Sequence, residues 1–594
     1  MKTCNLKKRV FEDQSDQPIT KCDFMNIAPD PVNETAGPSP ALQNITPLDA
    51  GTLSNDGYTI ELISGSAVID LLLNDGGFQQ NWDALYASCP WATVFQGRQF
   101  VAAWYQAYCE QHLPILVRAV ERGQLKGVLP MVLLNEGRIT GAGHYDAQYQ
   151  TWLAAPVGGN TFIKKALTEL IKQYPGNPIS FRFLPHGTPM SWLKEDKHWS
   201  QCSIIQPYSR PLLNFNDPEH TKILNGRKHF KNKLNRLKKL GEVRFETIRD
   251  LKTFEKSLTE MALLFDFRQS ALFNKSHFKD DPVKKEFLLE LFRLNLLHTT
   301  VLNVNGKMMA AVIAVTGENG WVYLAGINCH SPVNARFYSP GFMHFILLFK
   351  QLAEESVQYF DLTPGYDPYK EELANQHDEV TELVISSKKK FLIKKRVRKW
   401  VHTRLVAAGI RPMTIELALK KYNYLVRRRS VMSVIKGMAN RLHKKRKQQL
   451  YLVQANTLSA AKKISLHKDN LRDLMQFECG KRAAVTRWEF LGDAVYRLER
   501  GQHCYTWTEN GRLLCCAWFS YPDAASAQKD NDLVRDNTIE LQGFYYHGTA
   551  KDRLPDFLHG MIEATVNNER NSIYFLAGDR LFCRAMNEAG FRIV

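Results

Sequence analysis

The sequence has neither a metal-binding cysteine pattern nor a long apolar run. Its 11 cysteines are scattered, and none forms a Cys-x-x-Cys pair or lies at zinc-ligand spacing from a histidine. No apolar stretch approaches the roughly 20 residues that a membrane-spanning helix needs. No Ser-His-Asp or Cys-His arrangement for covalent catalysis is present either. The sequence therefore predicts free thiols, no metal, no spanning helix and no covalent enzyme intermediate.

The beginning of the chain predicts no secretory leader. The first residues, Met1-Lys2-Thr3-Cys4, run into charged and polar residues, which is not the pattern of a secretory signal. We expect a cytoplasmic protein, with any membrane contact being peripheral at the inner face of the membrane. Residues 1–55 are rich in Pro, Asn, Asp, Ser and Thr. They predict a disordered tail, because so little apolar surface cannot offset the entropy of ordering.

Length and charge are informative. A chain of 594 residues exceeds one ordinary core, so three or four modules are expected. The net charge of +18 is concentrated between residues 381 and 450, where 21 lysines and arginines face only Glu382 and Glu416. The rest of the chain is therefore near neutral.

This basic stretch contains interleaved apolar residues, among them Leu392, Val397 and Trp400. The pattern predicts amphipathic helix within a bridge at 386–450. Such a helix is attracted to anionic membrane surfaces or to RNA, and Trp400 beside cations favours the membrane interface. The alternative is a charged helical bridge between domains. A second basic helix, at 222–240, would either hold an anionic acceptor or present a solvated face over an apolar stripe.

The stretch from Thr299 to Leu373 carries the spacings of a functional site. It begins with three β-prone runs at 300–304, 308–315 and 321–327. Asn305-Gly306 joins the first two runs, and Asn-Gly is a strong hairpin signal because both residues tolerate positive φ. The sequence therefore predicts an antiparallel meander.

A helix and a returning strand follow the meander. Ser339-Pro340-Gly341 has the residues of a helix start, and the apolar run after it suits a mostly buried helix. Backbone N–H groups at such a start, with the helix dipole behind them, form an anion cradle. Residues 358–362 then read as a strand that leads into Thr363-Pro364-Gly365.

Three motifs in residues 254–373 resemble a known family. Phe267-Arg268-Gln269, Ser339-Pro340-Gly341 and the run from Phe360 to Lys370 (FDLTPGYDPYK) are similar to the CelD/BcsL-like, or BioF2-like, acetyltransferase domain. This is a branch of the GNAT superfamily related to the FemAB peptidyltransferases. The resemblance implies an acyl-CoA donor, acetyl-CoA, and a hydroxyl or amine acceptor on a cell-envelope saccharide or its precursor.

The resemblance also implies roles for individual residues. The pyrophosphate of the donor would lie at Tyr338, Ser339, Gly341 and Phe342, through backbone N–H groups. Tyr369 and Lys370 would polarise a carbonyl or grip a phosphate. Asp361 and Asp367 would act as bases or as partners of Lys370.

The acceptor side involves residues outside the cradle. Family members place the acceptor between two GNAT-like halves, so Asp146 or His144 would accept a proton there, unless Gly141–Asp146 is an ordinary loop. Arg268 lies in an apolar setting and needs a partner, which would be Asp266, a backbone carbonyl or a substrate phosphate. No metal is implied.

The fold class expected is α/β (α+β), with mixed central sheets flanked by helices. The first half, 56–210, reads as one GNAT-like unit and 211–385 as a second, followed by the bridge at 386–450. Residues 451–594 repeat the order hairpin, strand, helix, strand as a third unit. Its turn at Tyr546–Arg553 keeps one glycine and carries Asp552, which opposes a pyrophosphate, so a structural or acceptor-binding role is expected for this unit.

Two alternatives stay open at this point. A FemAB-like peptidyltransferase would use aminoacyl-tRNA, with the basic segments holding RNA. A non-catalytic scaffold would carry three degenerate GNAT-like units and use the basic bridge to bind a membrane.

Overall fold

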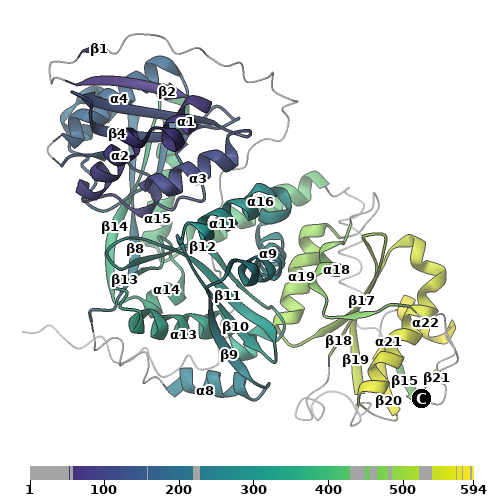
Figure 1. The fold of residues 1–594 in the computed structure, drawn as a ribbon. Coiled ribbons are helices and arrows are strands. Elements are labelled where there is room, and N and C mark those ends of the chain that lie inside the picture. The colour runs from purple at the N-terminus through teal and green to yellow at the C-terminus, as the bar shows by residue number, and fades with distance from the viewer. Residues whose placement is uncertain are drawn as a thin grey trace, which may run out of the picture.

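Two β-sheets organise the chain (Figure 1). The computed structural model describes residues 52–53, 58–156, 158–217, 228–428, 449–454, 464–478, 485–520, 538–569, 572–577, 580–588 and 592–593. The tail expected at 1–55, apart from residues 52–53, and the basic residues 429–448 lie outside this set. In the part described, the fold is mixed α/β, with a large mixed sheet flanked by helices, as the sequence predicts.

Strands of the larger sheet are β1 (Thr52–Leu53), β2 (Thr59–Ser64), β3 (Leu113–Glu121), β4 (Gln124–Leu133), β5 (Ile139–Gly141), β6 (Leu153–Ala154), β7 (Ile179–Leu184), β8 (Ser203–Asn214), β9 (Val243–Ile248), β10 (Leu297–Val304), β11 (Lys307–Thr316), β12 (Trp321–His330), β13 (Tyr359–Asp361) and β14 (Gln376–Ile385). Those of the smaller sheet are β15 (Gln449–Gln454), β16 (His467–Lys468), β17 (His503–Glu509), β18 (Arg512–Ser520), β19 (Thr538–Tyr546), β20 (Ser572–Ala577) and β21 (Arg592–Ile593).

Helices of the described chain are α1 (Ser66–Asn74), α2 (Gly76–Ser88), α3 (Arg98–Tyr108), α4 (Gly159–Gln173), α5 (Trp192–Glu195), α6 (Lys197–Cys202), α8 (Lys228–Lys238), α9 (Leu251–Phe273), α10 (His277–Asp280), α11 (Val283–Arg293), α12 (Ala335–Tyr338), α13 (Pro340–Glu354), α14 (Pro368–Leu373), α15 (Lys389–Ala407), α16 (Pro412–Arg428), α18 (Leu471–Met475), α19 (Arg487–Glu499), α21 (Leu554–Glu569) and α22 (Arg580–Glu588). Two 3-10 turns are η1 (Val94–Gln96) and η3 (Gly548–Arg553).

Three units share one strand order. In the second unit, four antiparallel strands, β9-β10-β11-β12, are followed by the parallel partner β13 and then by β8 and β14. The third unit repeats this order as β16-β17-β18-β19, parallel β20, then β15 and β21. The first unit repeats it as β2-β3-β4-β5, parallel β7, then β14 and β8. A helix connects each parallel pair: α4, α13 or α21.

The first two units exchange strands. β14 is the last strand of the second unit in sequence, but it lies between β7 and β8. It pairs with β8 along its whole length, from Gln376 opposite Leu212 to Ile385 opposite Ser203. β8 in turn pairs with β13. One continuous sheet therefore spans both units (Figure 1). The domain boundary that the sequence suggests, between residues 210 and 211, lies inside β8.

The meander of the second unit confirms the hairpin prediction. β10 and β11 pair antiparallel, and their turn uses Asn305 at φ 50° and Gly306 at φ 75°. The helix predicted after Ser339 is α13, whose first residue is Pro340. Fixed φ and the missing N–H make proline favourable there, because the first N–H of a helix has no partner within it.

The third unit packs on the second through one shared apolar core. Side chains of α9 and β11–β12 lie in the same buried cluster as side chains of α18, α19 and β17–β18. Trp488 donates its indole N–H to Ala271 O at 3.0 Å. Asn334 N donates to Leu498 O at 2.8 Å, so α19 also supports the segment that leads into α12. Within the described residues, no helix combines the length and apolar content needed to cross a bilayer.

Candidate active site

The turn at Tyr338–Phe342 joins α12 to α13. We call it the donor cradle because the sequence predicts that it holds the pyrophosphate of the donor. Ser339 lies between the two helices in the left-handed conformation, at φ 49° and ψ 51°. Such a residue reverses the chain abruptly and lets a new helix start in a new direction. Tyr338 and Ser339 are half-buried, whereas Gly341 and Phe342 are buried.

Backbone N–H groups of the cradle point out of the start of α13. Met343 N donates to Ser339 O at 3.0 Å. In the described parts of the chain, the backbone N–H groups of Gly341 and Phe342 have no acceptor. Two unsatisfied donors at the positive end of a 15-residue helix favour an anion at this place.

A basic helix lies beside the cradle. The Phe230 ring of α8 contacts the Phe342 ring with their centroids 5.3 Å apart, and the Lys233 ammonium lies 5.2 Å from the centre of the same ring. α8 packs against both α12 and α13, and Figure 1 shows it beside α13. The part of the predicted 222–240 helix that is described thus places its cations next to the cradle.

Strands β12 and β13 pair in parallel over only part of the length of β12. The pairing runs from Trp321 opposite Tyr359 to Tyr323 opposite Asp361. β13 then ends, while β12 continues to His330. Pairing with β11 also shifts at this place, so that Leu324–Gly326 of β12 lie opposite the single residue Ala314. A wedge therefore opens between the two strands, with its vertex at Tyr323 and Asp361.

Asp361 at this vertex belongs to a buried polar cluster. It is fully buried, accepts a hydrogen bond from the Tyr149 hydroxyl at 2.7 Å, and lies 3.3 Å from Arg210 Nη1. Arg210 also pairs through two nitrogens with Asp378. Tyr149 comes from the first unit and Arg210 from β8, so this cluster joins the two units.

Lys370 lies in the continuation of the same cluster. Its ammonium donates to Thr363 O at 3.1 Å and to Thr363 Oγ1 at 3.0 Å, and lies 3.5 Å from Asp367 Oδ2. Thr363 N in turn donates to Asp361 Oδ1 at 2.7 Å. Asp367 also forms an ion pair with Arg411, which precedes α16.

Three cations and three carboxylates make up the cluster, so its formal charge is balanced. Burial raises the pKa of Asp361 and lowers the pKa of Lys370. The opposite charges nearby counteract both effects. Tyr369, the neighbour of Lys370, is buried and stacks on Phe345 at 5.7 Å between ring centroids. The catalytic roles predicted for Lys370, Tyr369, Asp361 and Asp146 stay predictions. Two of these residues, Asp361 and Lys370, lie in one cluster.

Asp146 and His144 lie on the loop that leads to Tyr149. Asp146 accepts from Lys284 Nζ at 2.6 Å and from the Trp104 indole at 3.2 Å. Burial lowers the pKa of His144 well below its usual value, with Arg138 and other cations adding to the effect. The imidazole is therefore neutral at physiological pH. Lys284 belongs to α11, so this loop also contacts the second unit.

Arg268 has protein partners on two sides. Its Nη1 lies 3.2 Å from Glu499 Oε1 of α19 and 3.1 Å from His330 Nε2. Asp266, one of the partners expected from the sequence, instead accepts from the backbone N–H groups of Phe278 and Lys279. The substrate-binding role of Arg268 stays a prediction, and its ion pair joins the second unit to the third.

Four members of the cluster were not singled out by sequence reasoning: Tyr149, Arg210, Asp378 and Arg411. Tyr149, Arg210 and Arg411 come from segments far from residues 361–370, and Asp378 follows Lys370 by eight residues, on β14. The only signal in the sequence is polar or charged character at strand positions that otherwise read as buried, such as Arg210 among Pro207 to Leu213. A buried charge in a strand needs a partner, but the pattern does not say which.

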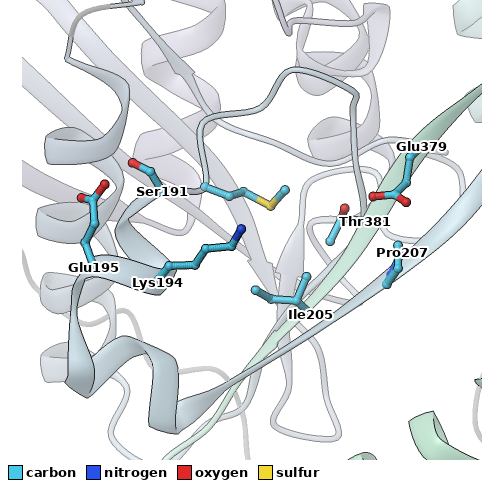
Figure 2. Close-up of a pocket in the computed structure, with 8 residues that line it drawn as sticks. Ser191, Lys194, Glu195, Ile205, Pro207, Glu379 and Thr381 are labelled. Carbon is cyan, nitrogen blue, oxygen red and sulfur yellow. The ribbon is translucent and has the colours of Figure 1, made fainter.

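A separate cavity lies on the sheet where the two units meet (Figure 2). Its volume is about 460 Å³, and it is lined by Met190, Ser191, Lys194, Glu195, Ile205, Pro207, Glu379 and Thr381. Figure 2 shows Lys194 of α5 directed into the space between that helix and strands β8 and β14. Among the residues that the structure describes, no group of three or more His, Cys, Asp or Glu side chains is arranged to hold a metal ion.

Part of the second unit matches a known protein family. Residues 225–371 match the acetyltransferase (GNAT) domain family. The matched segment contains the donor cradle, Asp361 and Lys370. No curated protein matched the sequence.

Three of the solved structures with similarity to the chain cover about half of it. The structure of L-PGS from Bacillus licheniformis has a TM-score of 0.37 and 11% identity, covering 55% of this chain and 96% of that one. FemX has a TM-score of 0.36 and 10% identity, covering 53% and 97%. A conserved protein of unknown function from Bacteroides thetaiotaomicron has a TM-score of 0.33 and 10% identity, covering 52% and 97%.

Proposed function

We propose that this protein is an acyltransferase of the GNAT type. It transfers an acyl group, proposed to be acetyl, from acyl-CoA to a hydroxyl or amine. The acceptor is proposed to be a cell-envelope saccharide or its precursor, as the resemblance to the CelD/BcsL-like domain implies. The acetyltransferase (GNAT) match at residues 225–371 supports the reaction class.

One observation carries the proposal: β12 and β13 part after three residue pairs, and the unsatisfied amides of Gly341 and Phe342 follow at the start of α13. An extended chain bearing amides can pair with the free edge of a strand, as an added strand does. The pantetheine arm of CoA is such a chain. We place it along β12, with the diphosphate at the donor cradle and the thioester near the vertex.

Charge next to the cradle supports an anionic donor. The described part of α8 contains Lys228, Lys231, Lys233, Arg236 and Lys238 and no acidic residue. Lys233 is the member that reaches the Phe342 ring. A CoA carries a diphosphate and a further phosphate, so it gains both from hydrogen bonds at the helix start and from cations beside it.

The reaction needs no covalent enzyme intermediate. The lone pair of the acceptor attacks the thioester carbon, the C–S bond breaks, and the proton of the acceptor leaves to a base while CoA departs as a thiolate that is then protonated. We assign His144 or Asp146 as the proton acceptor, since their loop leads to Tyr149 at the vertex and the His144 imidazole is neutral. Asp361 and Lys370, both paired with protein groups, hold the vertex and the Thr363 turn in position.

Isothermal titration of the full-length protein with acetyl-CoA tests the donor site. Ser339→Asp places a carboxylate at the cradle. Asp tolerates the left-handed conformation and is favourable at a helix N-terminus, so the fold should be retained. Repulsion of the diphosphate should weaken binding by about tenfold or more, equivalent to roughly 1.4 kcal/mol.

The matched control is His547→Asp, at the equivalent place before η3 of the third unit. It should leave acetyl-CoA affinity unchanged. A wild-type protein that does not bind acetyl-CoA, or equal weakening by both substitutions, contradicts the proposal. Binding of aminoacyl-tRNA without any binding of acetyl-CoA would instead favour the FemAB-like alternative.

A further inference from the structure

Helix α15 is apolar on two opposite faces. One face is packed against the protein: Leu392 is 5% exposed, and the His402 ring contacts Tyr208 of β8 at 5.4 Å between centroids. Lys399 Nζ also donates to Ile205 O at 2.5 Å. These contacts fix α15 along β8, so the helix is part of the folded body and not a loose linker.

The opposite face carries large apolar side chains in water. Ile393, Val397, Trp400 and Val401 are 58%, 56%, 61% and 41% exposed. Their spacing of four, three and one residues places them on one stripe of a helix. The next helix has a similar stripe, because Ile415, Leu419 and Tyr422 of α16 are 38%, 58% and 64% exposed. Exposed apolar patches of this kind mark interaction sites.

Cations flank the α15 stripe, and one of them, Arg398, pairs with Glu416 of α16 at 3.2 Å. The chain has no Asp or Glu between Glu382 and Glu416. Arg404 lies over the Trp400 ring, with its Cζ 5.6 Å from the ring centre. The other exposed basic residues here are Lys388, Lys389, Lys390, Lys394, Arg396 and Arg404.

We propose that α15 docks on the surface of an anionic lipid bilayer, with the stripe at Ile393, Val397, Trp400 and Val401 inserted among the headgroups and the flanking cations paired with lipid phosphates. An apolar stripe bordered mainly by positive charge is the pattern of an interfacial helix. The phosphates of an anionic bilayer complement this positive border in charge, which favours a lipid surface as the occupant. The helix lies on the membrane and does not span it.

Docking of α15 brings the candidate active site close to the bilayer. Arg411, four residues after the end of α15, pairs with Asp367 in the buried cluster. The His402 ring on the packed face also contacts Tyr366 at 6.0 Å. An acceptor carried by a lipid or held at the membrane would therefore be presented to this end of the molecule. The docking surface itself does not depend on the acyltransferase proposal.

Flotation of the full-length protein with vesicles tests the surface. One set is phosphatidylcholine alone, and the other is phosphatidylcholine mixed with phosphatidylglycerol. The wild type should float with the anionic set, and rising salt should release it. Val397→Ser combined with Trp400→Ser should lower vesicle partition by about tenfold or more, since two apolar anchors are lost. Leu73→Ser, on the exposed side of α1, is the control and should have no effect.

Two further double variants test whether vesicle binding requires the positive charge. Lys390→Gln with Lys394→Gln removes two exposed cations one helical turn apart beside the stripe, and should weaken partition by about tenfold. Lys252→Gln with Lys256→Gln removes the same spacing from the exposed side of α9, and should change partition little.

Three outcomes overturn the proposal. Absence of vesicle binding by the wild type is the first, and equal binding to neutral and anionic vesicles is the second. The third is partition that the Val397 and Trp400 changes leave unaltered. If those changes instead abolish binding to tRNA or dissociate a dimer, while vesicles never bind, the stripe serves RNA or a second copy and the membrane proposal is wrong. Each variant is first checked for wild-type thermal unfolding.

Discussion

The second and third units have the same strand order but different chemistry where the parallel strands connect. In both, the parallel pair holds over three residue pairs, and a helix joins its strands. In the second unit the connection is the left-handed Ser339 followed by α13, and among the described residues the Gly341 and Phe342 amides have no acceptor. In the third unit it is η3, where His547 accepts from Thr549 N through its ring and from Ala550 N through its backbone oxygen.

This difference separates architecture from activity. The same topology leaves helix-start amides available in one unit and gives them acceptors within the turn in the other. A few residues decide which of the two occurs. Asp552 adds a negative charge to η3. Fold-level similarity among the three units is therefore compatible with a single donor site.

The largest effect is expected on cooperative unfolding, and it depends on which strands complete the sheet of each unit. The third unit supplies β15 and β21 itself, whereas the first unit needs β14 from residues 376–385. A fragment of residues 58–202 should show no cooperative unfolding, because it lacks both β8 and β14 and leaves the edge of β7 unpaired. Joining residues 203–214 and 376–385 to it through a linker should restore a transition, measured by circular dichroism during urea unfolding.

The corresponding fragment of the third unit, 449–594, contains all seven strands of its sheet. It should unfold cooperatively without additions. Cooperative unfolding of 58–202 alone, or none in 449–594, would remove the distinction between exchanged and self-closed units.

The buried cluster gives the next largest effect. Lys370→Met removes one of its three cations and leaves carboxylates in excess in a dry site, which should cost about 3–5 kcal/mol of the free energy of unfolding. The comparison in the third unit is Arg553→Met, which breaks the exposed pair Arg553–Glu509 and should cost less than about 1 kcal/mol. Urea unfolding measures both.

Similar small losses in the two variants would mean that the cluster contributes little to stability. Lower turnover of Lys370→Met at wild-type stability would instead support the direct catalytic role that the sequence suggested.

Acid sensitivity of α13 is the smallest of the three effects. His344 is fully buried and lies 2.8 Å from Thr300 Oγ1, and burial lowers its pKa to about 3. Below the unfolded-state pKa of about 6.5 the unfolded chain takes up the proton and the folded one does not, so stability present above pH 6.5 is lost as pH falls. From pH 7 to pH 5 the loss should be about 2 kcal/mol from this residue.

His344→Gln should flatten that part of the stability profile relative to wild type, measured by urea unfolding at pH 5, 6 and 7. His559→Gln, at a half-buried position of the equivalent helix α21, is the matched variant. An unchanged slope in His344→Gln would show that this imidazole takes up its proton over the same pH range in the folded protein as in the unfolded chain.

Much of the second unit could be predicted from the sequence because its signals are local. Asn305-Gly306 gave the hairpin through the positive φ that both residues adopt. Pro340 gave the first turn of α13. Each signal acts within a few residues, where backbone preferences decide the conformation.

The strand exchange and the buried cluster could not be predicted in the same way. The pairing of β14 with β8 joins residues more than 160 positions apart, and the apolar patterns of the two strands would suit other neighbours as well. Arg268 was expected to need a partner, but Glu499 comes from the third unit. Partner choice for a buried charge depends on which distant carboxylate the fold brings near.

The sequence by itself determined the meander, the helix start at Ser339-Pro340-Gly341 and the position of the basic stretch, because local backbone preferences and net charge do not depend on long-range contacts. Only the tertiary structure decided that β8 and β14 exchange between units, that Asp361 pairs with Tyr149 and Arg210, and that one apolar face of α15 is packed while the other is left in water. Those outcomes depend on which surfaces meet when the chain collapses, and periodicity alone cannot distinguish a face that finds a partner within the protein from one that does not.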